Sequence, residues 1–300
     1  MNDSTLLNKL EFGVVLCCSS DVQGRYIEGQ LVMAPHDEDD NTHVVEEVMV
    51  VAEAEKRHVL TIVIVIAMQT EALPLVTKFQ LSQDLDSIFP KEVPWVRYHG
   101  IYRDLRINII CPGKDRVLRV DSVGTVSASL VTYASIQALQ PDLIINAGTA
   151  CGFRRRGACI GDVFLASDVA FHHRRNPIPV CDRNGICAKQ TFPTPNLLKE
   201  LKLKVGKLST GDSLDMSPHD EAAIIANDAT VKDMEGAAIA YVADLLSVPA
   251  IFVKAVTDIV DDDKPTAEEF LKNLVAVTAA LDQAVGQVVD FISGKCISEL

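Results

Sequence analysis

The stretch Thr61-Ile-Val-Ile-Val-Ile-Ala-Met-Gln-Thr-Glu71 decides the fold of this 300-residue chain. Its β-branched apolar residues run without polar interruption, which is typical of a strand that a parallel sheet buries on both faces. Open α/β sheets bind their ligands outside the carboxyl ends of such strands. Because Glu71 follows the strand directly, the pattern predicts a carboxylate at the ligand-binding edge of a sheet.

A second apolar stretch, Ala250-Ile-Phe-Val-Lys-Ala-Val-Thr-Asp258, also ends in an acid. Two acids carried to one sheet edge by different strands are candidates for a general acid and a general base acting on one substrate. Burial and nearby like charges would raise the pKa of Asp258, as a general acid near neutral pH requires. Taken alone, Glu71 is better explained as a first-turn carboxylate that the dipole of the next helix favours.

From residue 61 onward, short apolar runs alternate with amphipathic helical segments. This alternation predicts one α/β domain, a mixed and largely parallel central sheet flanked by helices. Besides the two stretches quoted above, the expected strands are Val96–Tyr102, Leu105–Cys111, Asp142–Asn146, Gly161–Val169, Val205–Thr210 and Thr230–Asp233. The expected helices are Glu71–Leu81, Ser122–Leu139, Asn196–Leu203, Asp220–Asn227, Gly236–Leu246 and Thr266–Ile292, the last with Thr266 as its N-cap. The proline-rich segment from Phe171 to Pro195 is expected to form a loop.

Residues 1–58 are rich in acids and lack periodicity, so we expect a disordered N-terminal extension before a domain that spans 59–300.

The net charge of −13 argues against nucleic-acid and anionic-membrane partners. The apolar runs are shorter than the roughly 18 to 20 residues of a membrane span. The eight cysteines include no Cys-x-x-Cys pair or zinc spacing, which favours reduced thiols and a cytoplasmic protein. A metal site at Asp258 and the following acids has no histidine nearby and is not expected.

Two further motifs follow strands. Asn146-Ala-Gly-Thr-Ala-Cys-Gly152 is a small-residue segment that predicts a tight loop whose backbone can approach a ligand. In Asp233-Met-Glu-Gly-Ala-Ala238, Glu235 stands at a helix start, where its carboxylate could accept hydrogen bonds from a vicinal diol such as ribose. A tight turn and a helix-dipole carboxylate are the structural explanations of the same motifs.

Together and in this order, five segments resemble the 5′-methylthioadenosine/S-adenosylhomocysteine nucleosidases, most closely their plant branch. The resemblance covers roughly residue 59 to the C-terminus. The segments are Ala67-Met-Gln-Thr-Glu-Ala72, Ile145-Asn-Ala-Gly-Thr149, Leu208-Ser-Thr-Gly-Asp-Ser-Leu214, Lys232-Asp-Met-Glu-Gly-Ala-Ala238 and Ala255-Val-Thr-Asp258.

The resemblance implies the nucleoside phosphorylase fold and hydrolysis of methylthioadenosine, and of S-adenosylhomocysteine as a further candidate substrate, within methionine salvage. Glu71 would activate the attacking water, and Asp258 would protonate adenine N7. Glu235 would hold the ribose hydroxyls, with Met234 packed against the sugar. The products would be adenine and 5-methylthioribose.

The resemblance also implies a homodimer that needs neither a metal nor a cofactor and whose partner molecule is a small nucleoside. Further substrate contacts would come from Thr149, Leu214, Lys232 and Asp233. Three positions depart from the family pattern: Cys151 replaces a glycine, His173 replaces an aspartate, and Cys181 lies in a segment that is usually more aromatic.

Three alternatives differ in the residues they require. A purine nucleoside phosphorylase would carry a Gly-Asp-Pro-x-Arg turn where this chain has Ala67-Met-Gln-Thr-Glu71, whose acid would repel phosphate. A non-catalytic nucleoside-binding or storage protein on the same fold would be signalled by loss of Glu71 or Asp258, and both are present. A dinucleotide-binding oxidoreductase would need a Gly-x-Gly-x-x-Gly fingerprint, which the chain lacks.

Overall fold

The computed structural model describes residues 57–175, 186–262 and 265–300, which lie within one compact unit, Val50–Leu300. Apart from residues 57 and 58, the predicted N-terminal extension lies outside the described residues. The strands are β1 (Thr61–Val65), β2 (Ser82–Gln83), β3 (Val96–Tyr102), β4 (Leu105–Cys111), β5 (Leu143–Gly152), β6 (Val163–Phe171), β7 (Lys189–Gln190), β8 (Lys204–Thr210), β9 (Val231–Asp233) and β10 (Ala250–Ile259). The helices are α2 (Gln69–Lys78), α3 (Thr125–Leu139), α5 (Pro195–Leu201), α6 (Pro218–Ala226), α7 (Gly236–Leu245) and α8 (Thr266–Ile292), with 3₁₀ turns η1 (Arg154–Arg156) and η2 (Ile297–Glu299).

One mixed sheet connects the strands in the order β10-β6-β8-β9-β5-β1-β4-β3-β2. Because β10 pairs with both β6 and β5, the strands β5, β10, β6, β8 and β9 form a closed ring of pairings. Strands β1, β4, β3 and β2 extend from β5 as an open wing. The long central ladders, β1 with β4 and β5, β10 with β5, and β6 with β8, are parallel, which confirms the predicted mixed, largely parallel α/β architecture.

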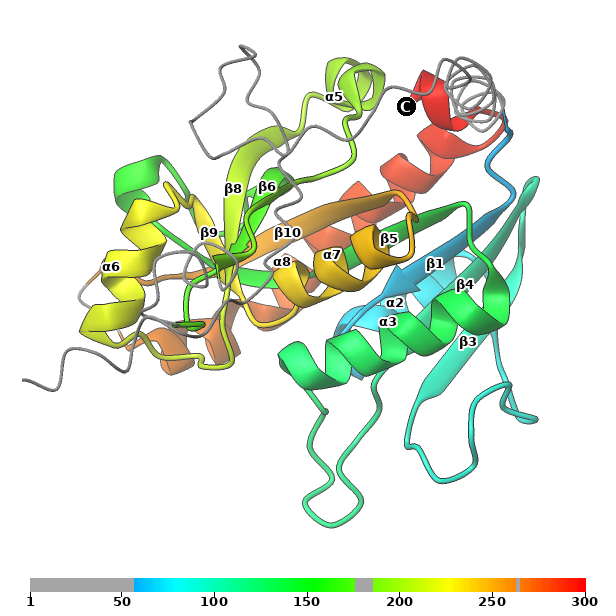
Figure 1. The fold of residues 1–300 in the computed structure, drawn as a ribbon, viewed down its shortest axis with the longest axis horizontal. Coiled ribbons are helices and arrows are strands. Elements are labelled where there is room, and N and C mark those ends of the chain that lie inside the picture. The colour runs from blue at the N-terminus through cyan, green and yellow to red at the C-terminus, as the bar shows by residue number, and fades with distance from the viewer. Residues whose placement is uncertain (1–56, 176–185, 263–264) are drawn as a thin grey trace, which may run out of the picture. The chain divides into compact units, whose positions relative to one another are not determined.

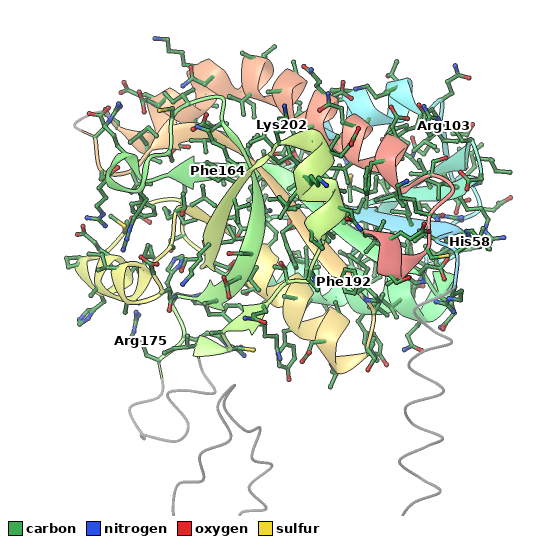
Figure 2. The ribbon with its side chains drawn as sticks, turned by 90° about the horizontal axis from the view of Figure 1, so that it is seen from above. His58, Arg103, Phe164, Arg175, Phe192 and Lys202 are labelled. Atoms are coloured by element: carbon green, nitrogen blue, oxygen red, sulfur yellow. The ribbon has the colours of Figure 1, made fainter. Side chains whose placement is uncertain are left out.

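Helices cover both faces of the sheet, because β1, β5 and β10 are apolar on both sides. All five residues of β1 and all ten of β10 are buried. One core lies between the sheet and the helices α2 and α8, and a second lies between the sheet and the helices α3 and α7. Figure 1 shows α3 and α7 side by side on the near face, and Figure 2 shows α8 on the opposite side of β10 from α7.

Helix α8 is long and apolar enough, by length and composition alone, to cross a membrane. Half of its most apolar window is buried inside the protein, however, as expected of a core helix. Its buried side chains, including Leu281, Val285 and Val289, belong to the core beneath the sheet. The apolar face of α8 is therefore explained by packing against β10 and α2.

Two local predictions were wrong. Strand β5 does not end at Asn146 but continues through Gly152, so the small-residue segment is a strand and not a loop. Its backbone groups pair with β10 from Ile144 to Gly152, and a ladder of that length cannot be inferred from local composition. Helix α8 begins at Thr266, but Pro265 occupies the N-cap position, so Thr266 is its first residue and not its cap.

The predicted loop between Phe171 and Pro195 is only partly described, because residues 176–185 lie outside the description. Within the described part, β7 pairs with β6 through Val169 with Lys189 and Asp168 with Gln190. This short strand had not been predicted, since two residues carry no readable alternation.

Candidate active site

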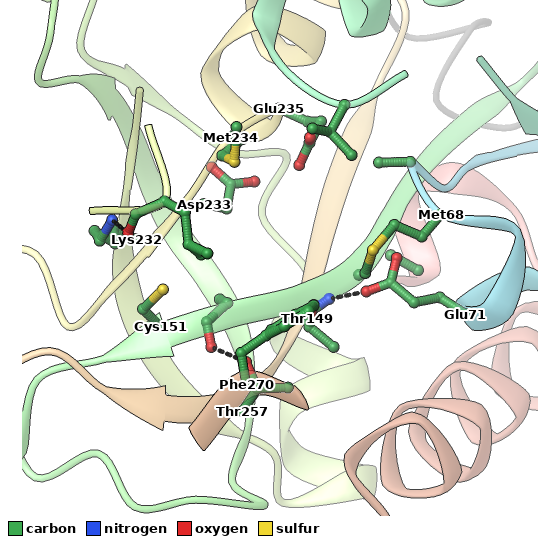
Figure 3. Close-up of a pocket in the computed structure, with 16 residues that line it drawn as sticks. Met68, Glu71, Thr149, Cys151, Lys232, Asp233, Met234, Glu235, Thr257 and Phe270 are labelled. Atoms are coloured by element: carbon green, nitrogen blue, oxygen red, sulfur yellow. Dashed lines mark hydrogen bonds between the residues drawn. The ribbon is translucent and has the colours of Figure 1, made fainter. Parts of the chain in front are cut away.

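A cavity of about 270 Å³ opens where β1, β5, β8, β9 and β10 end, which is the sheet edge that the two acidic stretches predict. Figure 3 shows its lining. Its walls are mostly apolar and enclose several carboxylates. The lining residues are Ala67, Met68, Glu71, Val123, Ala147, Gly148, Thr149, Ala150, Cys151, Leu214, Lys232, Asp233, Met234, Glu235, Thr257 and Phe270.

Glu71 reaches the cavity from the first turn of α2, where Met68 is the N-cap residue. Its side chain is 2% exposed, and Oε1 accepts a hydrogen bond of 2.8 Å from the backbone N–H of Thr149. Burial raises the pKa of Glu71, while the contacts with Thr149 and the charge of Lys254 partly offset that effect. The carboxylate is therefore fixed by β5, and its pKa is higher than that of an exposed glutamate.

Glu235 is the N-cap residue of α7 and is also buried. Its Oε1 accepts a hydrogen bond of 2.9 Å from the backbone N–H of Gly124, just before α3. Gly124 has φ +102°, and a Cβ there would lie 2.8 Å from Asp212 Oδ1, so a glycine is required to present this N–H. Burial, with the negative charge of Asp233, raises the pKa of Glu235 to about 7.

Asp233 lines the cavity, but both oxygens of its carboxylate already interact with donors within the protein. Oδ2 lies 2.7 Å from the Lys254 ammonium and accepts the N–H of Gly236 at 2.8 Å, while Oδ1 accepts the Thr210 hydroxyl at 2.6 Å. Lys254 is 1% exposed. This buried ion pair joins β9 to β10 and places a positive charge near Glu71 and Glu235.

Lys254 had not been predicted as a site residue. The available signal was a lysine in the middle of the otherwise apolar strand Ala250–Thr257, because a buried cation needs a partner. Lys254 lies outside the lining, whereas Met68, Val123, Thr257 and Phe270 line the cavity without having been predicted as site residues, although Met68 and Thr257 lie within the quoted motifs.

Lys232 lines the cavity through β9, yet its ammonium points to a neighbouring loop. Its Nζ donates to the backbone carbonyls of Ser213, Leu214 and Asp215 at 3.2, 2.6 and 3.2 Å. Three hydrogen bonds from one buried cation hold the segment that carries Leu214 against the cavity. The predicted contribution of Leu214 to the wall is thus explained by Lys232.

Asp258 is fully buried and does not line the cavity, whereas its neighbour Thr257 does. The ladder between β10 and β5 shifts register here, so that Val256 opposes Ala150 and Asp258 opposes Cys151. Such bulges redirect side chains and occur next to active sites. The Thr257 hydroxyl donates to Oδ1 at 2.8 Å, whereas Oδ2 has no hydrogen-bond partner. Burial raises the pKa of Asp258.

The structure therefore brings most of the predicted residues together. Seven of the eight predicted site residues line the cavity, and Asp258, outside the lining, accepts a hydrogen bond from Thr257 and pairs with Cys151 in the ladder between β10 and β5. The seven are Glu71, Thr149, Leu214, Lys232, Asp233, Met234 and Glu235. The arrangement offers an oriented buried carboxylate, a second carboxylate with its other oxygen available to hydroxyl groups, and a buried acid behind the wall.

The departures from the family pattern lie at different distances from this cavity. Cys151 is in its wall. His173 is outside the wall, with Nε2 3.3 Å from Oδ2 of Asp212, a carboxylate that accepts hydrogen bonds from Thr125 at the start of α3. Cys181 lies outside the described residues.

Two features of the described residues bear on the alternatives. No arginine is among the residues that line the cavity. No group of three or more histidine, cysteine, aspartate or glutamate side chains with metal-binding geometry was found in the described part of the chain. The first feature leaves the cavity without the guanidinium groups that phosphate binding favours.

Comparison with known proteins gives consistent results. The family model of the phosphorylase superfamily matches residues 61–290. A 5′-methylthioadenosine/S-adenosylhomocysteine nucleosidase of Arabidopsis thaliana is 64% identical over 251 residues, covering 84% of this chain and 99% of the relative. A 5′-methylthioadenosine nucleosidase of the same plant is 63% identical over 269 residues, covering 89% of this chain and all of the relative. A solved apo structure of an Arabidopsis thaliana 5′-methylthioadenosine nucleosidase matches with a TM-score of 0.81 and 65% identity, covering 81% of this chain and all of that one.

Proposed function

Since the chain belongs to the phosphorylase superfamily and, within it, to the 5′-methylthioadenosine/S-adenosylhomocysteine nucleosidases, we propose that it hydrolyses the N-glycosidic bond of 5′-methylthioadenosine. The products are adenine and 5-methylthioribose, in methionine salvage and in the cytoplasm. S-adenosylhomocysteine is the second candidate substrate. The observation that carries the proposal is the Glu71 carboxylate, held by the Thr149 N–H at the wall of a cavity whose described lining contains no arginine.

In the proposed mechanism, the bond between the sugar carbon and the purine nitrogen breaks, and its electron pair leaves with the purine. Asp258 gives its proton to the purine, so that the base departs neutral. A water attacks the resulting oxocarbenium-like sugar carbon and transfers a proton to Glu71. The raised pKa of Asp258 supports a protonated acid at the start of this step, and the Thr149 N–H supports an ionised Glu71.

The ribose is proposed to bind at Glu235 and Met234. The backbone N–H of Gly124 donates to Oε1 of Glu235, which leaves Oε2 to accept hydrogen bonds from the sugar hydroxyls. Carboxylates that accept hydrogen bonds from a diol need to be ionised, and Lys254 lowers the pKa of Glu235 against the effect of burial. Thr149, Leu214 and the backbone at Lys232 and Asp233 complete the proposed substrate contacts.

The decisive experiment incubates the purified protein with methylthioadenosine in phosphate-free buffer and follows adenine release by absorbance. We expect release without phosphate, and loss of at least about 100-fold in kcat for Glu71→Gln and for Asp258→Asn, since each removes a proton-transfer group. Release that requires phosphate would identify a phosphorylase. Tight nucleoside binding without any turnover would identify a binding protein.

The protein is further proposed to work as a homodimer. Helices α3 and α7 pack against each other and expose large apolar side chains: Val126 (70% exposed), Leu130 (56%) and Tyr133 (50%) on α3, and Tyr241 (44%) and Leu245 (63%) on α7. A clustered apolar surface of this kind on a globular protein marks an interaction site. Val123, which lines the cavity, lies just before α3, so a second subunit on this surface would lie near the cavity rim.

A further inference from the structure

The Cys151 thiol is buried in the cavity wall next to the proposed catalytic acid. It is 6% exposed and belongs to β5, directly opposite Asp258 of β10. Partners in a parallel ladder project their side chains to the same face of the sheet. The bulge at Thr257 is what brings Asp258, rather than Thr257, into register with Cys151.

The thiol is poorly suited to act as a nucleophile or a redox sensor. Burial and the negative charge of Asp258 raise the pKa of Cys151 well above its ordinary value. Reactive cysteines are instead thiolates in electropositive surroundings. Cys151 therefore stays protonated, and its S–H is a hydrogen-bond donor that faces a carboxyl group.

The carboxyl of Asp258 has few donors. The Thr257 hydroxyl donates a hydrogen bond to Oδ1 of Asp258, and the buried Oδ2 accepts no hydrogen bond. A protonated acid needs no donor at the oxygen that carries its own proton. Once that proton has moved to the purine, however, a buried carboxylate remains, and each missing donor then raises its free energy.

We propose that Cys151 is a positioning residue that donates its S–H to the Asp258 carboxylate as the purine takes up the proton. The proposal rests on the catalytic role given to Asp258 above. The resemblance implies a glycine at this position, and the thiol adds a hydrogen-bond donor in its place, in the wall of the cavity. Cys151 acts through Asp258 and takes no part in proton transfer itself.

Other charged groups also face Asp258 and set the background for a test. Lys232 from β9 lowers the pKa of Asp258, and Glu269 from α8 raises it. The interaction with Cys151 lowers the same pKa, as expected of a donor that favours the charged form. Removing the thiol should therefore raise the pKa of Asp258, and a stronger donor should lower it, while Lys232 and Glu269 stay unchanged.

The test compares Cys151→Ala, which lacks a donor, with Cys151→Ser, which has a stronger one. Cys159→Ala is the matched control, because Cys159 is exposed and outside the cavity. The first readout is the pH dependence of kcat for adenine release. We expect the alkaline limb, which reports Asp258, to lie at the highest pH in Cys151→Ala and the lowest in Cys151→Ser. We also expect kcat to fall about 5- to 10-fold in Cys151→Ala and to recover in Cys151→Ser.

The second readout does not depend on activity. In protein labelled with ¹³C at the aspartate carboxyl, the Asp258 signal is identified by its absence in Asp258→Asn and then titrated without substrate. We expect the pKa of Asp258 to be lowest in Cys151→Ser, intermediate in the wild type and highest in Cys151→Ala. An unchanged titration in all three proteins would overturn the positioning role, whatever the activity. An ordered titration with no adenine release would retain it and reject the proposed function.

Discussion

At the scale of single residues, the cavity holds more acids than cations. Glu71, Asp233 and Glu235 are buried, the charges of Asp233 and Glu71 both act on Glu235, and the buried ammonium of Lys254 acts on Glu71 and Glu235. Lys254 is ion-paired to Asp233, and its charge only partly offsets the effect of burial on Glu71 and Glu235. Glu71 and Glu235 therefore retain protons at a pH where exposed glutamates have lost theirs.

This retention predicts a cost in stability at Glu71. Its pKa is raised in the folded state, so above the ordinary value near 4.5 the folded protein binds more protons than the unfolded chain. The free energy of unfolding then falls as the pH rises from that value to the raised pKa, by up to about 1.4 kcal/mol per pH unit. Glu71→Gln keeps an oxygen that can accept the Thr149 N–H and removes the charge. At pH 7.5 we expect Glu71→Gln to have a higher Tm than the wild type, by about 2–4 °C for each kcal/mol gained in the free energy of unfolding. At pH 4.5 the difference in Tm between the two proteins should be smaller.

Thermal denaturation at the two pH values checks this prediction, with Glu200→Gln on the exposed surface of α5 as the control. The control should change Tm at neither pH. A Glu71→Gln protein that is less stable than the wild type at pH 7.5 would show that the ionised carboxylate stabilises the fold, contrary to the effect of burial.

At the scale of elements, the ends of strands determine which side chains face the cavity. The extra residue in β10 brings Asp258 into register with Cys151, and the ammonium of Lys232 on β9 holds the loop after β8. Both effects are contacts between neighbouring strands and not properties of one strand. The loop of residues 213–215 is anchored to β9 through the three carbonyls that accept hydrogen bonds from Lys232.

Lys232→Met should therefore loosen this loop. Three carbonyls lose a charged donor worth about 1.5–3 kcal/mol for a single bond, and Leu214 would no longer be fixed against the cavity. We expect KM for methylthioadenosine to rise about 10-fold and Tm to fall. The alkaline limb of kcat should also move to higher pH, because Lys232 lowers the pKa of Asp258. Lys207→Met on the adjacent strand β8 is the control, since its ammonium is exposed. A normal KM in Lys232→Met would contradict the anchoring role.

At the scale of the whole molecule, the described residues bury two large apolar cores and one smaller cluster, and an apolar surface on α3 and α7 is left exposed. That surface is the proposed dimer interface. Helix α8, on the other side of the sheet, also exposes apolar side chains such as Leu271, but its buried face is already covered by β10. The two helices therefore provide a matched pair of sites for a test of assembly.

Leu130→Glu on α3 places a charge on the proposed interface without disturbing the core, because Leu130 is 56% exposed. We expect the wild type to sediment at about twice the 32.6 kDa mass of the chain and Leu130→Glu to sediment as a monomer with reduced adenine release. Leu271→Glu, at a site 71% exposed on α8, should remain dimeric. A monomeric wild type would reject the interface.

The sequence by itself determined the elements whose signals are local. The hairpin strands Val96–Tyr102 and Leu105–Cys111 and the long helix Thr266–Ile292 have the predicted bounds, because alternation, turn residues and helical periodicity all lie within a few residues of each position. The family and the fold were also readable from the order of five motifs. The acids at two strand ends indicated which edge of the sheet carries the cavity.

Only the tertiary structure decided how the charges and strand ends meet. The continuation of β5 to Gly152, the register shift that sets Asp258 opposite Cys151, and the pairing of Lys254 with Asp233 all join segments distant in the chain. A hydrogen-bond ladder or an ion pair is a property of two segments, and neither segment encodes the position of the other. The catalytic residue types are thus a matter of sequence, whereas their burial, pKa and orientation arise from the contacts that the fold creates.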